Sequence, residues 1–281
     1  MLFKDFIFSF KNIHISFLEK KMPRKLFKVG FSILYKYLFL ELFVYNFFYK
    51  KNLDQISKKN AQLFKEDFNF LFKYFNSLRQ LHNYQDFFNE NLKNIKNKKL
   101  NILEIGIEKG AGLACIYFYF PYSNIVGVDN NPFKNQYKSK RIRNIYVDIS
   151  SKKILKNLSN YLKIEFDLII DDCSHKLIDQ ILCFVENFKN LKKGGIYIAE
   201  DLNFPEIHKV YNPTNESLSL KSILKKIELG EDVNSNHIAK EDFEYLKNNI
   251  ENIKFYKSKN VKNYLIMDIC GYSEIVFIKK K

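Results

Sequence analysis

The sequence predicts an α/β fold in which a mainly parallel sheet is covered by helices on both faces. Short apolar runs alternate with helical segments, a glycine-rich turn follows the first run, and acidic residues follow most of the others. Alternation of this kind is typical of a parallel sheet whose strands are joined by helices. The predicted strands are residues 100–106, 124–129, 143–148, 166–172 and 196–199, with closing strands at 253–256 and 273–279, the last of them antiparallel.

Composition limits the choice of partners without settling it. The chain has 281 residues, 46% of them hydrophobic, and a formal net charge of +15. Such a charge suits nucleic acid, an anionic membrane face or a phosphorylated substrate. Because the lysines are scattered along the whole chain, a solvated surface is the simpler interpretation, and nucleic acid is not favoured. The four cysteines form no C-x-x-C pair, which indicates reduced thiols in a cytosolic protein.

Residues 1–95 are predicted to form a helical, aromatic and basic N-terminal region. Phenylalanines and lysines interleave in residues 1–51, and residues 52–81 continue with helical periodicity. The longest uncharged piece, Leu42 to Tyr49, is far below the ~20 residues that span a bilayer. Two interpretations remain: a basic aromatic face resting on the inner membrane leaflet, or a helical cap packed on the rest of the chain or on a second subunit. The cap is favoured, and self-association is expected.

The glycine-rich turn after the first strand predicts a ligand site. Glu104-x-Gly106-x-x-x-Gly110-x-Gly112 lacks the G-x-G-x-x-G spacing with which a dinucleotide site cradles a pyrophosphate. The next strand ends at Asp129, where a carboxylate can meet ribose hydroxyls. This unit therefore indicates a nucleotide-type ligand, the glycine spacing weakens the case for a dinucleotide, and an ordinary α/β turn is the alternative.

Acidic residues gather where the fourth and fifth strands end. Asp172-x-x-His175 follows the fourth strand, and Glu200-Asp201 follows the fifth. Adjacent strands lie about 5 Å apart, so the three carboxylates can converge, and a hard cation such as Mg²⁺ would relieve their repulsion. His175, expected in the first turn of a helix, can face the same cavity as a neutral base. Helix capping and a solvated turn are the structural alternatives.

Two motifs resemble a known family. Residues 170–175 read I-D-D-C-S-H, and residues 191–202 read L-K-K-G-G-I-Y-I-A-E-D-L. They are similar to the I-D-D-G-S-H and L-K-P-G-G-x-Y-x-x-E-D-L patterns of metal-dependent sugar O-methyltransferases, which include macrolide-sugar and bacterial surface-glycan enzymes. The resemblance covers residues 82–202. The chain departs from the pattern at Cys173, where glycine is usual, at Lys193, where proline is usual, and at Gly112, where serine is common.

The resemblance implies a class I methyltransferase fold, which is Rossmann-like, with a seven-stranded sheet and S-adenosylmethionine (SAM) and Mg²⁺ as cofactors. It implies that His175 is the general base acting with Asp172. The implied metal ligands are Asp172, Glu200 and Asp201. Asp129 is expected at the SAM ribose and Asp148 beside the adenine, with Glu104, Gly106, Gly110 and Gly112 forming the cofactor loop, and His82 and Tyr84 are expected to meet the substrate.

The predicted domains are the helical region 1–95 and a methyltransferase domain 96–281, in which residues 203–240 form a lid or substrate loop. The expected reaction is methylation of a sugar hydroxyl on a small sugar, nucleotide sugar or glycan, in capsule or other glycan biosynthesis, by a cytoplasmic enzyme. The alternatives are an N-methyltransferase for a small phosphorylated or nucleic-acid substrate, a non-catalytic membrane-associated protein with this fold, and a dehydrogenase.

Overall fold

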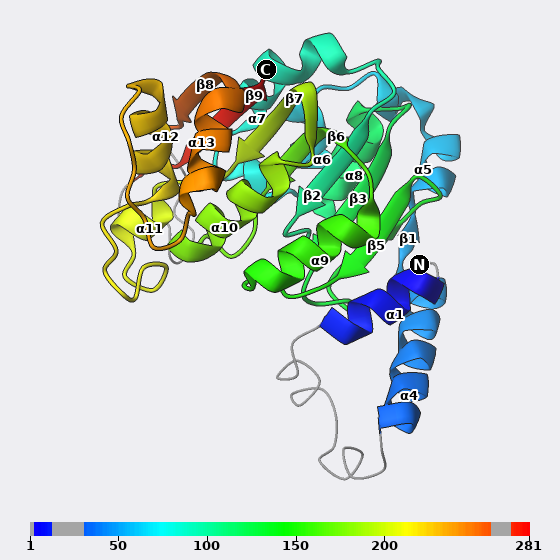
Figure 1. The fold of residues 1–281 in the computed structure, drawn as a ribbon. Helices are drawn as coiled ribbons and strands as arrows, with labels where there is room; N and C mark the ends of the chain where they lie inside the picture. The colour runs from blue at the N-terminus through cyan, green and yellow to red at the C-terminus, as the bar shows by residue number, and fades with distance from the viewer. Residues whose placement is uncertain (1–2, 13–30, 260–270) are drawn as a thin grey trace.

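The computed structural model describes residues 3–12, 31–259 and 271–281, and it confirms the predicted fold (Figure 1). Seven strands form one sheet in the order β5-β3-β2-β6-β7-β9-β8. The first five of these are mutually parallel, and β9 runs antiparallel to both β7 and β8. The strands are β2 (Asn101–Ile105), β3 (Asn124–Asp129), β5 (Ile142–Tyr146), β6 (Phe166–Asp171), β7 (Leu191–Ala199), β8 (Ile250–Lys257) and β9 (Glu274–Lys280).

Strand β7 begins earlier than the sequence predicts. The strand was expected at residues 196–199, but residues 191–195 also belong to β7, opposite a register shift between Phe166 and Leu168 of β6. Gly194 absorbs this irregularity with a φ of +73°, which glycine adopts without strain.

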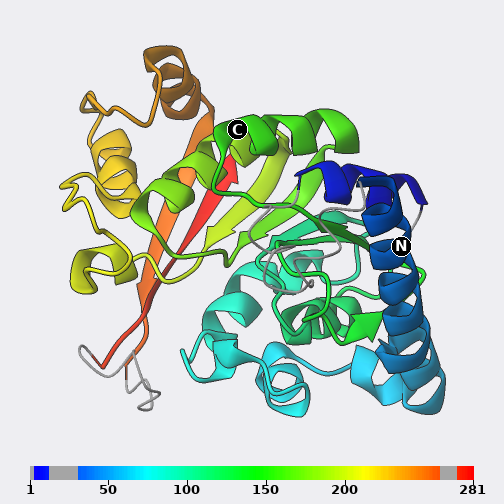
Figure 2. The same cartoon turned by 90° about the horizontal axis from the view of Figure 1, so that it is seen from below.

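Alternating strand residues pack into two cores, one on each face of the sheet. In β2, Leu103 and Ile105 face one core, and Ile102 faces the other. Figure 2 shows the sheet between the two helical layers. The first core is covered by α9 (Lys152–Leu162), α10 (Leu177–Phe188), α12 (Leu220–Glu228) and α13 (Lys240–Asn249), and the second by α5 (Leu53–Lys59), α6 (Phe68–Tyr74), α7 (Gln85–Leu92) and α8 (Ala111–Tyr119).

The helical periodicity of residues 52–81 is divided among short helices. Asn52 caps α5 by accepting a hydrogen bond from the backbone N–H of Asp54, and Asp67 caps α6 in the same way through Phe70. Single 3₁₀ turns at Ala61–Phe64 and Leu78–Gln80 connect these helices, and a third at Lys93–Ile95 follows α7. Phenylalanines of α6 and α7 share the core beneath α8, so this part of the N-terminal region packs directly on the sheet.

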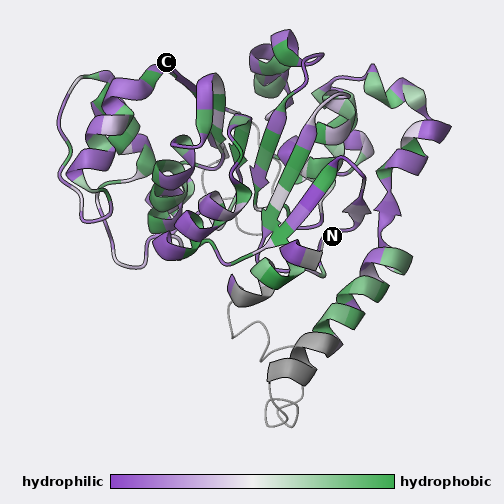
Figure 3. Ribbon diagram, turned by 45° about the vertical axis from the view of Figure 1, so that its right-hand side comes forward, coloured by the Kyte–Doolittle hydropathy of each residue, from purple (hydrophilic) through white to green (hydrophobic). Residues whose placement is uncertain are grey.

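Two further helices lie at the β5 edge of the sheet. Helix α1 (Phe3–Asn12) lies against β5, where the backbone N–H of Tyr146 donates to Ser9 Oγ at 2.8 Å. Helix α4 (Phe31–Val44) extends away from the body of the molecule, continues into a π-helical turn at Tyr45–Tyr49, and is largely apolar (Figures 1 and 3). Among the described residues, no helix combines the length and the apolar character that crossing a bilayer requires.

Candidate active site

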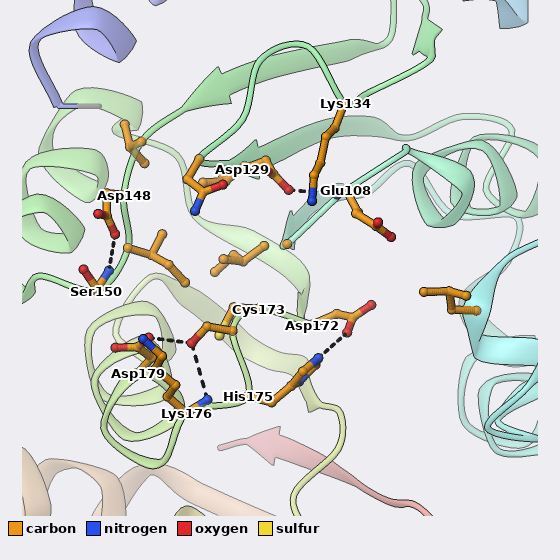
Figure 4. A pocket seen from close by; sticks show the side chains of 18 residues that line it. Glu108, Asp129, Lys134, Asp148, Ser150, Asp172, Cys173, His175, Lys176 and Asp179 are labelled. Carbon is orange, nitrogen blue, oxygen red and sulfur yellow. Dashed lines mark hydrogen bonds and ion pairs between the residues drawn. The ribbon is translucent and has the colours of Figure 1, made fainter. Parts of the chain in front are cut away.

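A cavity of about 460 Å³ opens at the carboxyl ends of β2, β3, β5 and β6 (Figure 4). This is the edge at which open α/β sheets bind their ligands. Five of the residues predicted from the sequence line it, and the side chain of Cys173 lines it as well. The predicted five are Gly106, Asp129, Asp148, Asp172 and His175.

The glycine turn brings two strand ends close together. Gly106 has a φ of +85°, and a Cβ atom built on it would lie 1.9 Å from the carbonyl oxygen of Asp172. Only a residue without a side chain fits this contact. Gly110, at the N-cap position of α8, has a φ of +79°, and a Cβ there would lie 2.2 Å from Asn135 Oδ1. Gly106 therefore lines the cavity, whereas Gly110 shapes the turn behind it.

Asp129 and Asp148 lie across the cavity from Asp172, which follows β6 (Figure 4). Asp129 accepts hydrogen bonds from the backbone N–H groups of Glu108 and Asn131, both at 2.8 Å. Burial raises the pKa of Asp129, while these two bonds and the charge of Lys134 oppose that rise. Asp148 accepts from the N–H of Ser150 at 3.0 Å. Each carboxylate keeps further lone pairs with which it can accept hydroxyl or amino donors.

Asp172, His175 and Asp201 form a compact group at the end of β6 and β7. His175 Nε2 lies 3.8 Å from Asp172 Oδ1 and 3.6 Å from Asp201 Oδ2. One possible ligand atom from each residue lies within 4.8 Å of the others. Glu200, which was expected to complete the carboxylate group, is not a member of it. Its Oε1 instead accepts from Arg79 Nε at 2.7 Å.

The position of His175 differs from the expectation. It precedes α10, which begins at Leu177, and its φ is +56°. The loop is held by Ser174, whose hydroxyl donates to Asp179 Oδ2 at 2.5 Å. The His175 ring packs against the ring of Phe204, with the two ring centroids 5.2 Å apart. Burial lowers the pKa of His175, with the charge of Asp201 opposing it. The neutral imidazole that results can accept a proton.

His82 and Tyr84 were expected to meet substrate, and neither lines the cavity. Both are buried against Asp201. Tyr84 Oη donates to Asp201 Oδ1 at 2.7 Å, and His82 Nδ1 lies 3.0 Å from the same oxygen. The hydroxyl of Ser273 also donates to it, at 2.6 Å. Burial alone would raise the pKa of Asp201, but the charges of His82 and His175 and these donors hold it well below its ordinary range.

Sequence reasoning missed Arg79. Its guanidinium is buried and contacts Glu104, Glu200 and Asp172. Glu104, expected in the cofactor loop, does not line the cavity, and its Oε1 accepts from Arg79 Nη1 at 2.7 Å. Gly112, where serine is common in the resembling family, leaves room for this guanidinium. A Cβ there would lie 2.2 Å from Arg79 Nη1.

No family model matches the chain. It is 26% identical over 129 residues to the 8-demethyl-8-alpha-L-rhamnosyl tetracenomycin-C 2'-O-methyltransferase of Streptomyces olivaceus, covering 43% of this chain and 34% of that protein. It is 28% identical over 129 residues to the mycinamicin VI 2''-O-methyltransferase of Micromonospora griseorubida, covering 43% of this chain and 32% of that protein. The matches thus span about a third of each curated relative.

A solved structure of the MycE methyltransferase, in complex with Mg, SAH and mycinamycin VI, has the same fold. The TM-score is 0.59 at 20% identity, over 76% of this chain and 54% of that one. The relatives are of the class that the two motifs predict, and the expected resemblance is confirmed.

Proposed function

We propose that the chain is a SAM-dependent O-methyltransferase that acts on a sugar hydroxyl with the help of a divalent cation. The observation that carries this proposal is one cavity with two chemically different sides. Asp129 and Asp148 line one side, and Asp172 and His175 line the other (Figure 4). Asp201 does not line the cavity but lies against His175. Two ligands bound in such a cavity would be held in contact, and positioning of this kind is a major source of rate enhancement.

The side of the cavity at Asp129 suits a nucleoside. Its carboxylate follows β3, where ribose hydroxyls are bound in folds of this topology. The Gly106 turn lets a ligand approach the backbone closely. The adenine would then lie toward Asp148, and the methyl group toward Asp172 and His175. Support comes from the placement of these residues around one cavity.

The other side of the cavity suits a hard cation. Asp172 and Asp201 each turn one carboxylate oxygen toward His175, and carboxylate oxygens are the ligands that Mg²⁺ prefers. Glu200, the third ligand predicted from the sequence, lies outside this group and is bound by Arg79 through Oε1. When bound, the cation would lower the pKa of a coordinated hydroxyl. His175 Nε2 would accept the hydroxyl proton. The methyl group of SAM would pass to the hydroxyl oxygen as its bond to sulfur breaks, which would leave S-adenosylhomocysteine.

The substrate class rests on the relatives. The two curated relatives are both named O-methyltransferases, one of a rhamnosyl tetracenomycin and the other of mycinamicin VI. We infer a sugar, nucleotide sugar or glycan acceptor for this chain and place the reaction in capsule or other surface-glycan biosynthesis in the cytoplasm. Residues 203–240 adjoin the site through Phe204 and Tyr211, whose rings pack near His175, and would contact the acceptor.

The test is methyl transfer by the full chain with SAM, Mg²⁺ and a panel of free and nucleotide-linked hexoses and 6-deoxyhexoses, read by mass spectrometry. His175→Ala and Asp172→Ala should each lower turnover at least ~100-fold, because general-base catalysis contributes on that scale, while SAM binding survives. Asp167→Ala, at a carboxylate that pairs with Lys192 outside the cavity, is the control and should retain activity. Retained turnover in both site variants would contradict the proposal.

A further inference from the structure

We propose that Arg79 is a positioning residue for the cation site, and that the affinity of the site for a divalent cation depends on its guanidinium. The inference rests on the function proposed above and adds to it a residue from the N-terminal region. Arg79 does not line the cavity, and its side chain is only 3% exposed. It would act through the carboxylates that it holds.

One guanidinium joins carboxylates at three neighbouring strands. Arg79 Nη1 lies 2.7 Å from Glu104 Oε1, Nε lies 2.7 Å from Glu200 Oε1, and Nη2 lies 3.4 Å from Asp172 Oδ2. Glu104 is in β2, Asp172 follows β6 and Glu200 follows β7, and these strands are adjacent in the sheet. Only arginine offers a planar fork of donors that can serve several carboxylates at once. The three strand ends are thus tied through a single side chain.

The contacts distinguish the two oxygens of each carboxylate. Arg79 holds Asp172 by Oδ2, and Asp172 Oδ1 faces His175. Asp201 is held by Oδ1, through Tyr84 and Ser273, and its Oδ2 faces His175. In both cases one oxygen is tied to the protein and the other is turned toward the group in which a cation would bind. Partners of this kind orient metal ligands in known sites.

The place of the guanidinium is built into the fold. Gly112 of α8 leaves the space that Nη1 occupies, and the ring of Phe88 lies 5.5 Å from the guanidinium carbon. Glu104, Glu200 and Asp172 would repel one another if they were buried together without a cation. Arg79 supplies a permanent positive charge among them, so the carboxylates can keep their geometry before a divalent cation arrives. Removal of the Arg79 guanidinium should therefore lower the affinity of the cation site more than that of the SAM site.

The experiment measures Mn²⁺ binding to the full chain by electron paramagnetic resonance of the free ion, alongside calorimetric SAM binding without metal. In Arg79→Gln the Mn²⁺ dissociation constant should rise 10–100-fold, the usual range for loss of such a partner. Arg79→Lys keeps the charge and loses the fork, so its dissociation constant should lie between those of the wild type and Arg79→Gln. SAM affinity should stay within about threefold in both variants, since neither touches that side of the cavity.

Arg141→Gln is the matched control, and it should bind Mn²⁺ as the wild type does. Arg141 donates to the carbonyl oxygens of Tyr117, Phe120 and Ser123, and these contacts lie apart from the cation group. If the wild type binds Mn²⁺ and both Arg79 variants bind it equally well or more tightly, the inference about Arg79 is overturned and the proposed function stands. If the wild type binds SAM but no divalent cation, the metal-assisted mechanism fails and Arg79 loses this role with it.

Discussion

Gly106 brings the backbone after β2 against the backbone after β6, and the cavity depends on that contact. Gly106→Ala should abolish SAM binding and destabilise the protein by more than about 3 kcal/mol. The left-handed φ alone costs an alanine about 1–2 kcal/mol, and overpacking adds about 1–3 kcal/mol. The added Cβ would lie 1.9 Å from a backbone oxygen, which no side-chain movement can relieve. Urea unfolding and SAM calorimetry measure the two effects.

Gly194→Ala provides the comparison. Gly194 has a φ of +73°, and a Cβ there would have nothing within 4 Å. Gly194→Ala should therefore lose only about 1–2 kcal/mol, the amount that a left-handed φ costs an alanine, with SAM binding intact. Equal destabilisation by the two substitutions would show that the close approach at Gly106 is not what requires glycine there.

The buried Lys50 should make the stability of the folded protein depend on pH. Its ammonium is buried, lies 3.0 Å from the hydroxyl of Tyr146, and is near the charge of Lys138. Burial, and then Lys138, lower the pKa of Lys50 to about 7. Between pH 7 and about 10.5 the unfolded chain binds more protons than the folded one, so the Lys50 contribution to stability grows as the pH rises through this window. Below pH 7 that contribution is lost.

The unfolding free energy of Lys50→Met should consequently exceed that of the wild type by most near pH 6, and this excess should shrink toward pH 10. Urea unfolding of both proteins at pH 6, 8 and 10 measures the difference in unfolding free energy. Lys51→Met, at an exposed neighbouring lysine, should show no such trend. A Lys50→Met difference that stays constant with pH would contradict the lowered pKa.

The sequence predicted those site residues that follow strands and have a chemical motif. Asp129, Asp148, Asp172 and His175 all line the cavity because parallel strands end at one edge. It could not predict that Glu104 and Glu200 face Arg79, since this arginine belongs to no motif and these two partners are 25 and 121 residues away in the chain. Tertiary packing decides whether a carboxylate at the end of a strand faces the cavity or a buried partner such as Arg79.

At the scale of elements, α1 covers the edge of the sheet. Asp5 is fully buried, and its Oδ1 accepts from Arg143 Nε at 2.9 Å and from the hydroxyl of Tyr161 at 2.8 Å. Ser9 satisfies an N–H of the edge strand β5. Unpaired strand edges promote association with other chains, and a covering helix prevents it. Helix α1 is thus tied to β5 by polar contacts as well as by Phe6.

Asp5→Ala should lower the unfolding free energy by about 2–4 kcal/mol, because it leaves Arg143 and Tyr161 without their shared partner. Thermal and urea unfolding give the value, and light scattering reports any aggregation through the uncovered edge. Lys4→Ala, at an exposed position in the same helix, should change stability by less than about 0.5 kcal/mol. An Asp5→Ala protein as stable as Lys4→Ala would show that α1 does not depend on this contact.

Element types were more predictable than their ends. The strands of the parallel sheet were predicted from short apolar runs, and all of them are present in the structure. The helix that contains α10 was expected to begin at Cys173, with His175 in its first turn, four residues before the observed start at Leu177. In the structure His175 is left-handed instead, and backbone conformations that depend on a surrounding loop leave little trace in the sequence.

At the scale of the whole molecule, α4 and the π-helical turn after it carry an exposed aromatic surface. Its members Phe43, Phe47, Phe48 and Tyr49 are each more than half exposed. Exposed apolar patches of this kind mark interaction sites. The surface consists of uncharged rings, and we propose that the self-association expected from the sequence covers it with a second copy of the chain.

The double variant Phe47→Ser with Phe48→Ser should therefore shift the protein toward the monomer in sedimentation velocity. Flotation with vesicles containing phosphatidylserine tests the alternative, contact with the inner membrane leaflet. Phe70→Ser with Tyr74→Ser, on an exposed stacked pair of α6, is the control. A wild-type monomer that floats with anionic vesicles would replace self-association by membrane contact.

The most direct test of the account is calorimetric titration of SAM into the full chain, with and without Mg²⁺, compared with Asp129→Ala. We expect micromolar binding that Asp129→Ala removes. Binding should persist in Asp167→Ala, whose carboxylate accepts from the N–H of Asn101 and pairs with Lys192 outside the cavity. Absence of SAM binding by the wild type under both conditions would contradict the assignment of the cavity and, with it, the proposed methyl transfer.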